Sequence, residues 1–189
     1  MRAIAWLLCK TLFRLNTTGR DNIPKEGGAI IAANHSSYID PVALAVAIPR
    51  RISWIVRKDV YDVWWLKGLF ASTGMIREGG SVGKAIQLLE QGGLVGVFPE
   101  GTRSPDGKLG AGKKGAAVMA LKTGVPVIPC GITGAFEAYP RGAVFPRPFP
   151  VKVSIGKPVA AGRHIDPGDE KTAATLDMIM AAIDDEMGR

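Results

Sequence analysis

Five short apolar runs, most of them bounded by glycine or proline, recur along the chain and constrain its fold more than any other feature. They lie at residues 29–33, 52–56, 94–98, 125–130 and 151–155. Apolar runs of this length predict buried strands. Helical patterns occupy residues 41–48, 81–91, 115–122 and 171–187. Because strands alternate with helices, we expect a single α/β domain with a mixed, mostly parallel sheet that helices cover on both faces.

The composition fits one globular domain with an excess of positive charge. The chain has 189 residues, of which 47% are hydrophobic and 22% are charged, and this is enough for one domain with a core. Its formal net charge of +7 favours anionic partners such as phosphate groups, a membrane surface or nucleic acid. Nucleic acid is the weakest of these interpretations, because the sequence has no recognised binding module and no interleaving of aromatic and basic residues.

Residues 1–15 predict a short amphipathic helix. The apolar stretch between Arg2 and Lys10 is far shorter than the ~20 residues that span a bilayer, and we do not expect a signal peptide. One interpretation is an interfacial helix with basic anchors, followed by the α/β domain at residues 16–189. The other is a helix that packs on the core of that domain. The side chains on its apolar side are those of Ile4, Leu8, Leu12 and Leu15.

The strongest chemical signal is the segment at residues 34–40 (NHSSYID), directly after the first apolar run. Histidine is the default general base near neutral pH, so His35 is a candidate for that role. Asp40 is a carboxylate that can orient the imidazole and stabilise its protonated form. No serine or cysteine stands in a nucleophile-elbow pattern beside this pair. The pair therefore predicts a base that activates a hydroxyl of the substrate, without a covalent enzyme intermediate.

A second polar segment at residues 97–104 (VFPEGTRS) also leaves an apolar run. Arg103 offers a planar fork of donors that suits phosphate oxygens. Gly101 allows close approach of the backbone, and Thr102 adds a hydroxyl donor. Glu100 is expected to accept a bond from a substrate hydroxyl or to hold an arginine. We favour a binding site over a surface turn with an Arg–Glu pair, because active groups of α/β folds gather at strand ends.

Several other segments carry weaker signals. Arg77, beside flexible glycines, is a cation that could reach the same anion, although such residues are commonly solvated. Lys113 and Lys114, before another helix, have the same ambiguity. The run at residues 125–130 contains two prolines, which predicts a strand at an edge or a bend, with a structural role or a role in shaping an acyl-chain wall. Residues 63–66 (VWWL) are interpreted either as an interfacial patch or as ordinary core.

Histidine and cysteine are too few and too scattered to predict a metal site. His164, in a loop before the last helix, is expected to be a solvated loop residue. Cys9 and Cys130 are far apart in the sequence. A disulfide between them is possible, but a reducing compartment is the simpler interpretation.

In their order along the chain, these segments resemble the sequence blocks of the glycerolipid acyltransferase family. His35 and Asp40 match the HxxxxD spacing of block I, and residues 98–104 match FPEGTRS of block III without a mismatch. Residues 125–132 match the VPxxPxxI-like run of block IV. The likeness covers roughly residues 19–158, and within the family it is greatest to bacterial 1-acylglycerol-3-phosphate (lysophosphatidic acid) acyltransferases.

The resemblance implies a reaction and a role for each matched residue. His35 would take the proton from the sn-2 hydroxyl of lysophosphatidic acid, with Asp40 orienting it. The oxygen would attack the thioester of acyl-CoA or an acyl carrier protein and form phosphatidic acid. Either donor is a co-substrate, and the resemblance implies no cofactor and no metal. The residues that would hold the glycerol phosphate of the acceptor are Glu100, Gly101, Thr102 and Arg103, with Arg77 assisting.

The expected place of action is the cytoplasmic face of the cell membrane, with the protein peripheral or monotopic and the lysophospholipid acceptor in the bilayer. Two alternatives stay open. The acceptor could be another lyso-lipid or polar molecule, such as a lyso-ornithine lipid or glycerol 3-phosphate. The chain could also be a non-enzymatic basic membrane-binding protein, although the intact polar residues of blocks I and III argue against it.

Overall fold

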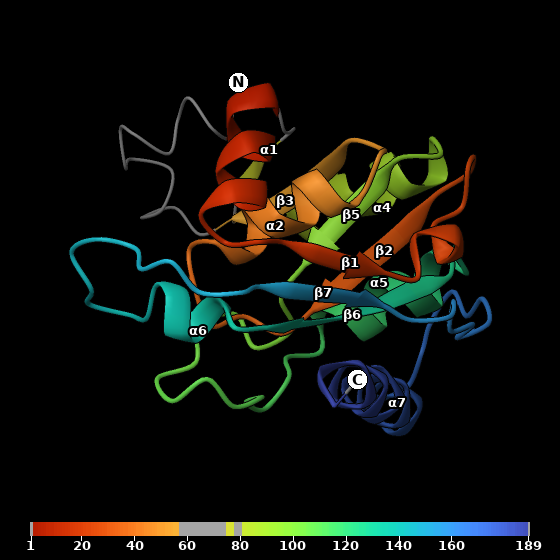
Figure 1. Ribbon diagram of the computed structural model, residues 1–189. Coiled ribbons are helices and arrows are strands. Elements are labelled where there is room, and N and C mark those ends of the chain that lie inside the picture. Colours follow the sequence, from red (N-terminus) through yellow and green to blue (C-terminus); the bar gives the residue numbers. More distant parts are fainter. Residues whose placement is uncertain (1, 57–74, 78–80, 189) are drawn as a thin grey trace.

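A seven-stranded sheet forms the centre of the computed structural model, which describes residues 2–56, 75–77 and 81–188 (Figure 1). The strand order is β1-β7-β6-β2-β5-β3-β4. Among these strands β6 and β7 pair antiparallel and all other neighbours pair parallel, which confirms the mixed, mostly parallel sheet. The strands are β1 (Asn16–Thr18), β2 (Ala29–Ala33), β3 (Ile52–Val56), β4 (Met75–Arg77), β5 (Leu94–Val97), β6 (Val127–Thr133) and β7 (Lys152–Ile155).

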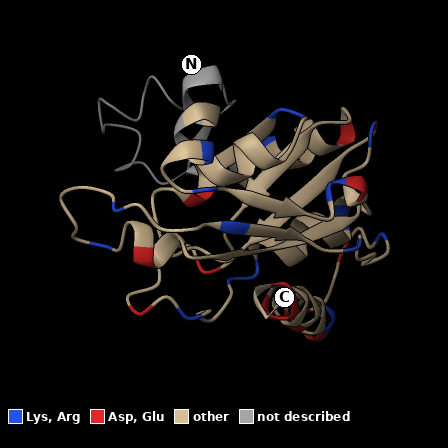
Figure 2. Cartoon of the chain, viewed as in Figure 1, with Lys and Arg blue, Asp and Glu red and all other residues tan. Residues whose placement is uncertain are grey.

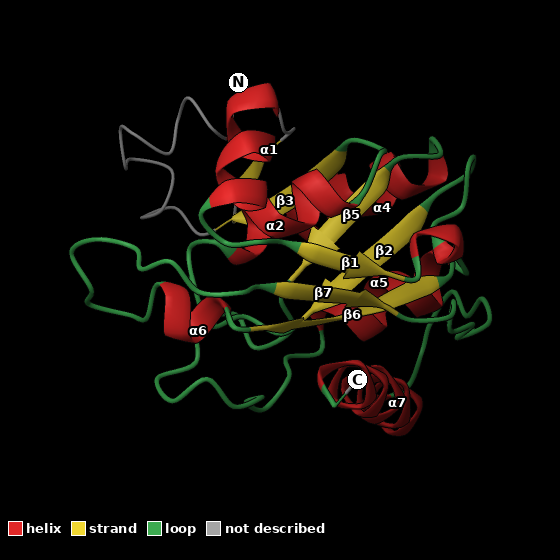
Figure 3. Ribbon diagram, in the orientation of Figure 1, coloured by secondary structure: helices red, strands yellow, loops and turns green. Residues whose placement is uncertain are grey.

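Helices cover both faces of the sheet, as predicted (Figure 3). Helices α1 and α2 pack on one face, and α4, α5 and α7 pack on the other. The short helix α6 follows β6, and a 3-10 turn, η1, follows β1. The bounds are α1 (Arg2–Thr11), η1 (Arg20–Asn22), α2 (Asp40–Ala47), α4 (Ser81–Glu90), α5 (Gly115–Thr123), α6 (Ala135–Ala138) and α7 (Asp169–Met187).

The central strand β2 shows why its sequence is apolar throughout. Ala29, Ile31 and Ala33 join the core under α1 and α2, whereas Ile30 and Ala32 join the core under α4, α5 and α7. A parallel strand with both faces buried has no polar side, so its sequence does not alternate. Because β2, β5, β3 and β4 run parallel, their carboxyl ends meet at one edge of the sheet. The segments at residues 34–40 and 98–104 emerge at that edge.

Of the two alternatives for residues 125–130, an edge or a bend, the edge position is wrong. The strand lies between β2 and β7 and extends from Val127 to Thr133. The carbonyl of Pro129 accepts a hydrogen bond from the backbone N–H of Gly156, 2.8 Å away. Within a strand the N–H and C=O of one residue point to the same side, so the missing N–H of Pro129 faces the end of the β7 ladder. The proline therefore removes one terminal hydrogen bond and leaves the pairing with β2 intact.

Two strands, β1 and β4, were not predicted. Each has three residues and lies at one end of the sheet order. The sequence of β1 (Asn16–Thr18) contains no apolar side chain, so the hydrophobic pattern carries no signal for it. Its pairing is decided by β7, which lies far away in the sequence.

The N-terminal segment is helical and partly integrated into the domain. Cys9, Phe13 and Leu15 are buried in the core that α2 shares, which supports the packed-helix interpretation. The side chains of Trp6 and Leu7 are exposed, so the interfacial interpretation stays a prediction. Among the described residues, no helix combines the length and the apolarity that crossing a bilayer requires. The apolar cluster at residues 63–66 lies outside the described residues.

Candidate active site

The predicted histidine–aspartate pair is formed at the carboxyl end of β2. The Nδ1 atom of His35 lies 2.8 Å from Oδ2 of Asp40, at the start of α2. The same Oδ2 accepts the backbone N–H groups of Ser36 and Ser37, each at 2.7 Å. Asp40 is fully buried and His35 is 18% exposed. A carboxylate only accepts hydrogen bonds, so this contact places the imidazole proton on Nδ1 and leaves the lone pair of Nε2 free to act as a base.

A stack of rings fixes the plane of the imidazole. The ring of His35 stacks on Phe98 with centroids 4.0 Å apart and an angle of 15° between the planes. Phe98 in turn stacks on the buried Trp54 of β3, with centroids 5.0 Å apart. Phe98 is the first residue of block III. Block III therefore packs against one face of the imidazole ring of block I.

The segment at residues 98–104 also bonds to both main-chain groups of His35, the N–H and the carbonyl. Oε1 of Glu100 accepts the backbone N–H of His35 at 2.8 Å, and its Oε2 accepts the backbone N–H of Gly110 at 2.9 Å. The backbone N–H of Ser104 donates to the carbonyl of His35 at 2.7 Å. Burial raises the pKa of Glu100, while the bonds from His35 and Gly110 oppose that rise. Both carboxylate oxygens of Glu100 are therefore engaged by main-chain donors.

Asn34 is a positioning residue that the sequence analysis did not single out. Its Nδ2 donates to the carbonyl of Ile132 at 2.8 Å, and its Oδ1 accepts the N–H of Ile132 at 2.7 Å. The side chain thus continues the β2–β6 ladder one residue beyond Ala33. The sequence signal for this role is an asparagine directly after an apolar run, although its partner on β6 is visible only in the structure.

Two cationic side chains lie at the turn of block III, the segment that bonds to the main chain of His35. The guanidinium carbon of Arg103 lies 3.6 Å from the ring centroid of Tyr38, which belongs to block I. Gly101 has a φ of +67°, and a Cβ on it would lie 2.7 Å from Nζ of Lys113. The ammonium group therefore lies over the Gly101 backbone, two residues from Arg103. Thr102 is exposed on the same turn. A cation stacked on an aromatic ring is held in place without losing its charge.

Arg77 and His164 lie away from this group of residues. Arg77 ends β4, at the same sheet edge as His35 but three strands further along, which is roughly 14 Å at normal strand spacing. The structure does not describe its side chain, so its binding role stays a prediction. The backbone of His164 bonds to Leu121 near the end of α5, and the adjacent Arg163 lies close to Gly124, which precedes β6. His164 therefore lies toward the opposite edge of the sheet from His35.

A family model described as Acyltransferase matches residues 14–133, which is more than half of the chain. The chain belongs to the acyltransferase family. The match includes blocks I and III, and it ends at the last residue of β6. The segments that follow β6, including α6, β7 and α7, lie outside it.

Curated proteins similar to this chain are named as acyltransferases. The 1-acyl-sn-glycerol-3-phosphate acyltransferase of Bacillus subtilis (strain 168) is 29% identical over 170 residues, covering 85% of this chain and 81% of that protein. The chloroplastic 1-acyl-sn-glycerol-3-phosphate acyltransferase LPAT1 of Arabidopsis thaliana is 30% identical over 140 residues, covering 69% of this chain and 39% of that protein. The chloroplastic 1-acyl-sn-glycerol-3-phosphate acyltransferase BAT2 of Brassica napus is 27% identical over 180 residues, covering 88% of this chain and 52% of that protein. The chain therefore spans about half or less of the length of these two plant relatives.

A solved acyltransferase structure has the same fold. The crystal structure of the 1-acyl-sn-glycerophosphate (LPA) acyltransferase PlsC from Thermotoga maritima matches with a TM-score of 0.78 at 26% identity. The match covers 100% of this chain and 80% of that one. The α/β architecture expected from the sequence is therefore confirmed by a known member of the family.

Proposed function

We propose that this protein is a 1-acylglycerol-3-phosphate acyltransferase, which transfers a fatty acyl group from acyl-CoA or acyl carrier protein to the sn-2 hydroxyl of lysophosphatidic acid. The observation that carries the proposal is the bond between His35 and Asp40, held next to Arg103 by the segment at residues 98–104. A base beside fixed cations suits a phosphorylated alcohol as the acceptor. The names of the bacterial and plant relatives support the same reaction.

The chemistry needs one base and no covalent enzyme intermediate. Nε2 of His35 takes the proton of the acceptor hydroxyl while the hydroxyl oxygen bonds to the thioester carbonyl carbon. The tetrahedral intermediate then expels the thiolate, which takes a proton from the imidazolium. Asp40 stabilises that imidazolium through the Nδ1 contact. General-base assistance contributes about 10²–10⁴-fold, so positioning of the two substrates supplies much of the remaining acceleration.

The phosphate of the acceptor would bind at the turn of block III. Arg103 is held over the ring of Tyr38, so it meets the ligand with little loss of side-chain freedom. Gly101 and Thr102 would line the same turn, with Lys113 above it. Arg77 would assist from the end of β4. Glu100 is assigned a positioning role rather than a contact with glycerol, because its two oxygens hold the backbone of His35 and Gly110.

A lipid acceptor would place the reaction at a membrane surface. The proposed location is the cytoplasmic face, where acyl-CoA and acyl carrier protein are found, with the protein held peripherally. The formal net charge of +7 favours contact with anionic lipid headgroups.

The deciding experiment is acyl transfer by the purified protein to a panel of acceptors in liposomes. The panel contains lysophosphatidic acid, a lyso-ornithine lipid and glycerol 3-phosphate, with labelled acyl-CoA or acyl carrier protein as donor. We expect the highest turnover with lysophosphatidic acid. We also expect His35→Ala to lose acyl transfer while it stays folded, and His164→Ala, the matched control, to retain it. Equal turnover in both variants would contradict the general-base assignment.

A further inference from the structure

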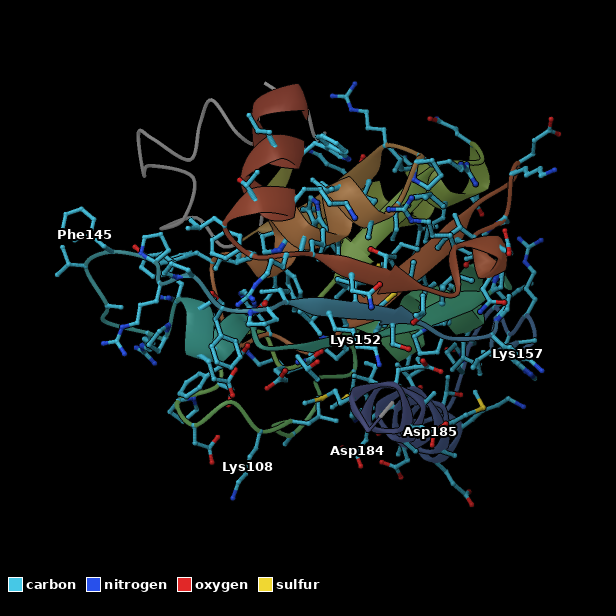
Figure 4. The ribbon with its side chains drawn as sticks, in the orientation of Figure 1. Lys108, Phe145, Lys152, Lys157, Asp184 and Asp185 are labelled. Atoms are coloured by element: carbon cyan, nitrogen blue, oxygen red, sulfur yellow. The ribbon has the colours of Figure 1, made fainter. Side chains whose placement is uncertain are left out.

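The loop between α6 and β7, at residues 140–150, exposes an unusual amount of apolar surface. We call this segment the apolar loop. Val144 and Phe145 are each 78% exposed, and Phe149 is 40% exposed. Figure 4 shows the side chain of Phe145 pointing away from the rest of the molecule. The loop contains four prolines, two exposed arginines (Arg141 and Arg147) and no acidic residue. It is therefore a stiff segment with an apolar tip and cationic flanks.

The apolar loop lies beside the active site. Strand β6 runs parallel to β2, so the chain leaves it at the sheet edge where His35 lies. The hydroxyl of Ser37 in block I donates to the carbonyl of Tyr139, directly before the loop, at 2.8 Å. The backbone N–H of Arg147 donates to the carbonyl of Ala138 at 2.7 Å and closes the base of the loop. The loop is thus anchored to the elements that carry the proposed base.

A second exposed apolar element adjoins the apolar loop. The N–H of Val151, at the end of the loop, donates to the carbonyl of Phe13 after α1 at 2.8 Å. On α1 the side chains of Trp6 and Leu7 are 52% and 55% exposed. In Figure 1 the apolar loop extends at the left of the molecule, and α1 stands above the β1–β7 side of the sheet. Among the described residues, five of the seven exposed large apolar side chains belong to these two elements.

We propose that the apolar loop inserts Val144 and Phe145 into the interface of an anionic bilayer and so holds the active-site edge against the membrane. The inference rests on the proposed function, because a lysophospholipid acceptor must reach His35 from a bilayer. Arg141 and Arg147 complement anionic headgroups, and Figure 2 shows basic and no acidic colouring along the loop. Prolines lower the entropy that the loop loses on insertion. A tip of apolar side chains between arginines matches the boundary between acyl chains and headgroups.

Vesicle binding tests this proposal without any acyl transfer. The double variant Val144→Ser with Phe145→Ser is compared with the wild type in sedimentation with sucrose-loaded vesicles of phosphatidylcholine and phosphatidylglycerol. The double variant loses two apolar side chains that would be buried in the bilayer. This is expected to lower the partition coefficient about tenfold or more. Ile165→Ser is the matched control, because Ile165 is 83% exposed and its loop packs toward the opposite sheet edge. Equal partitioning of the double variant and this control would overturn the proposal.

Charge gives a second readout. Arg141→Gln with Arg147→Gln is expected to weaken binding to vesicles with phosphatidylglycerol about fivefold or more per arginine, and to change binding to pure phosphatidylcholine little. Binding that is insensitive to both the lipid charge and these two substitutions would also overturn the proposal. A third outcome would overturn it as well. In that outcome the wild type binds an acidic acyl carrier protein, the double serine variant no longer binds it, and the variant still partitions onto vesicles like the wild type.

A site-directed probe tests insertion directly. Cys9 and Cys130 are buried, so a polarity-sensitive fluorophore on Phe145→Cys labels the apolar loop selectively among the described residues. A blue shift with vesicles and quenching by brominated acyl chains are expected, whereas an unchanged spectrum would overturn insertion. Acyl transfer to a short-chain, monomeric lysophosphatidic acid should be the same in the wild type and the double serine variant. A protein that binds vesicles through the loop but transfers no acyl group would refute the proposed function alone.

Discussion

Two buried carboxylates of this protein have opposite surroundings. Asp40, at the start of α2, accepts hydrogen bonds from two backbone N–H groups and contacts a partly exposed imidazole. Glu186, near the end of α7, accepts the hydroxyl of Ser154 in β7, under the body of the helix. A Cβ on Gly131 would overlap the main chain of Glu186, so helix and sheet are in direct backbone contact there. The first carboxylate faces a group that can exchange protons with a substrate, and the second is enclosed.

The comparison shows that burial of a carboxylate does not by itself indicate an active site. What distinguishes Asp40 is its partner His35, which follows the carboxyl end of the parallel strand β2 and remains 18% exposed. The Ser154 hydroxyl that bonds to Glu186 is buried, in a strand inside the sheet. The functional assignment therefore depends on the accessible partner, and the following predictions test that distinction.

The largest effect is expected from Asp40→Asn. An amide fills the same space but does not stabilise the imidazolium, so kcat should fall by about 10²–10⁴-fold. The midpoint of urea unfolding should change little in comparison. Steady-state kinetics with saturating acceptor and donor measure the effect. A variant with unchanged kcat would place Asp40 in the same structural class as Glu186.

The second-largest effect is expected on stability, from substitutions at the contact between α7 and the sheet, with kcat unchanged. Gly131→Ala forces α7 away from β6 and should lower the free energy of unfolding by about 1–3 kcal/mol. Glu186→Ala leaves the Ser154 hydroxyl buried without this acceptor and should cost about 1–3 kcal/mol. The kcat per folded molecule should stay the same in both. Urea denaturation and active-site-normalised kinetics measure the two quantities.

The control for these substitutions is Gly83→Ala, in α4, where a new Cβ meets no other atom within 4 Å. It should stabilise the protein by about 0.5–1 kcal/mol, because alanine favours a helix over glycine. A loss of kcat in Gly131→Ala or Glu186→Ala at temperatures where the variant is folded would remove the contrast between the two carboxylates.

Glu100→Gln is the intermediate case, because Glu100 lies in the site but bonds only main chain. A glutamine cannot accept both the His35 and the Gly110 N–H groups, so one bond is lost and the imidazole shifts. We expect kcat to fall by about tenfold, from the loss of one hydrogen bond to a charged acceptor, while KM for the acceptor stays constant. A raised acceptor KM with constant kcat would instead support direct contact with the glycerol phosphate.

The same variant has a pH signature. Burial raises the pKa of Glu100, so the folded protein keeps this proton to a higher pH than the unfolded chain does. Between the unfolded and the folded pKa the native state binds more protons, so this group's contribution to stability falls as the pH rises. Glu100→Gln should remove that decline. Urea midpoints of both proteins across mildly acidic to neutral pH measure it, and parallel curves would contradict it.

The smallest effect is expected at the two cysteines. Burial raises the pKa of Cys9 to about 11 and also raises the pKa of Cys130, to which the charge of Glu186 adds. At pH 8 only about one Cys9 thiol in a thousand would be ionised, so both thiols should resist a disulfide reagent until urea is added. Rapid reaction of either cysteine in the native protein would show that this core opens more readily than its burial indicates.

Local patterns in the sequence were enough for most of the fold and for the proposed base. The apolar runs at β2, β3 and β5 predicted strands within one residue, because strands buried on both faces need uninterrupted apolar sequence. His35 and Asp40 were found because they are five residues apart in one turn, so their contact needs no remote segment. The helical pattern at residues 115–122 matches the helix Gly115–Thr123 to within one residue, and Gly124, with a φ of +72°, follows it.

Contacts between remote segments could not be read in the same way. The sequence indicates that Glu100 and Asn34 are polar groups at strand ends, but it does not indicate their partners. Glu100 bonds to His35 and Gly110. Asn34 bonds to Ile132. The position of β6 inside the sheet and the existence of the three-residue strand β1 likewise depend on pairing with β7, which lies far away in the sequence from β1.

Hydrophobic periodicity and short-range spacing are properties of neighbouring residues, so the sequence by itself determined the α/β class, the longer helices and the histidine–aspartate pair. The direction in which each backbone N–H points depends on how all the strands pack. Only the tertiary structure therefore decided that block III holds the main chain of His35, and that the apolar loop stands beside it.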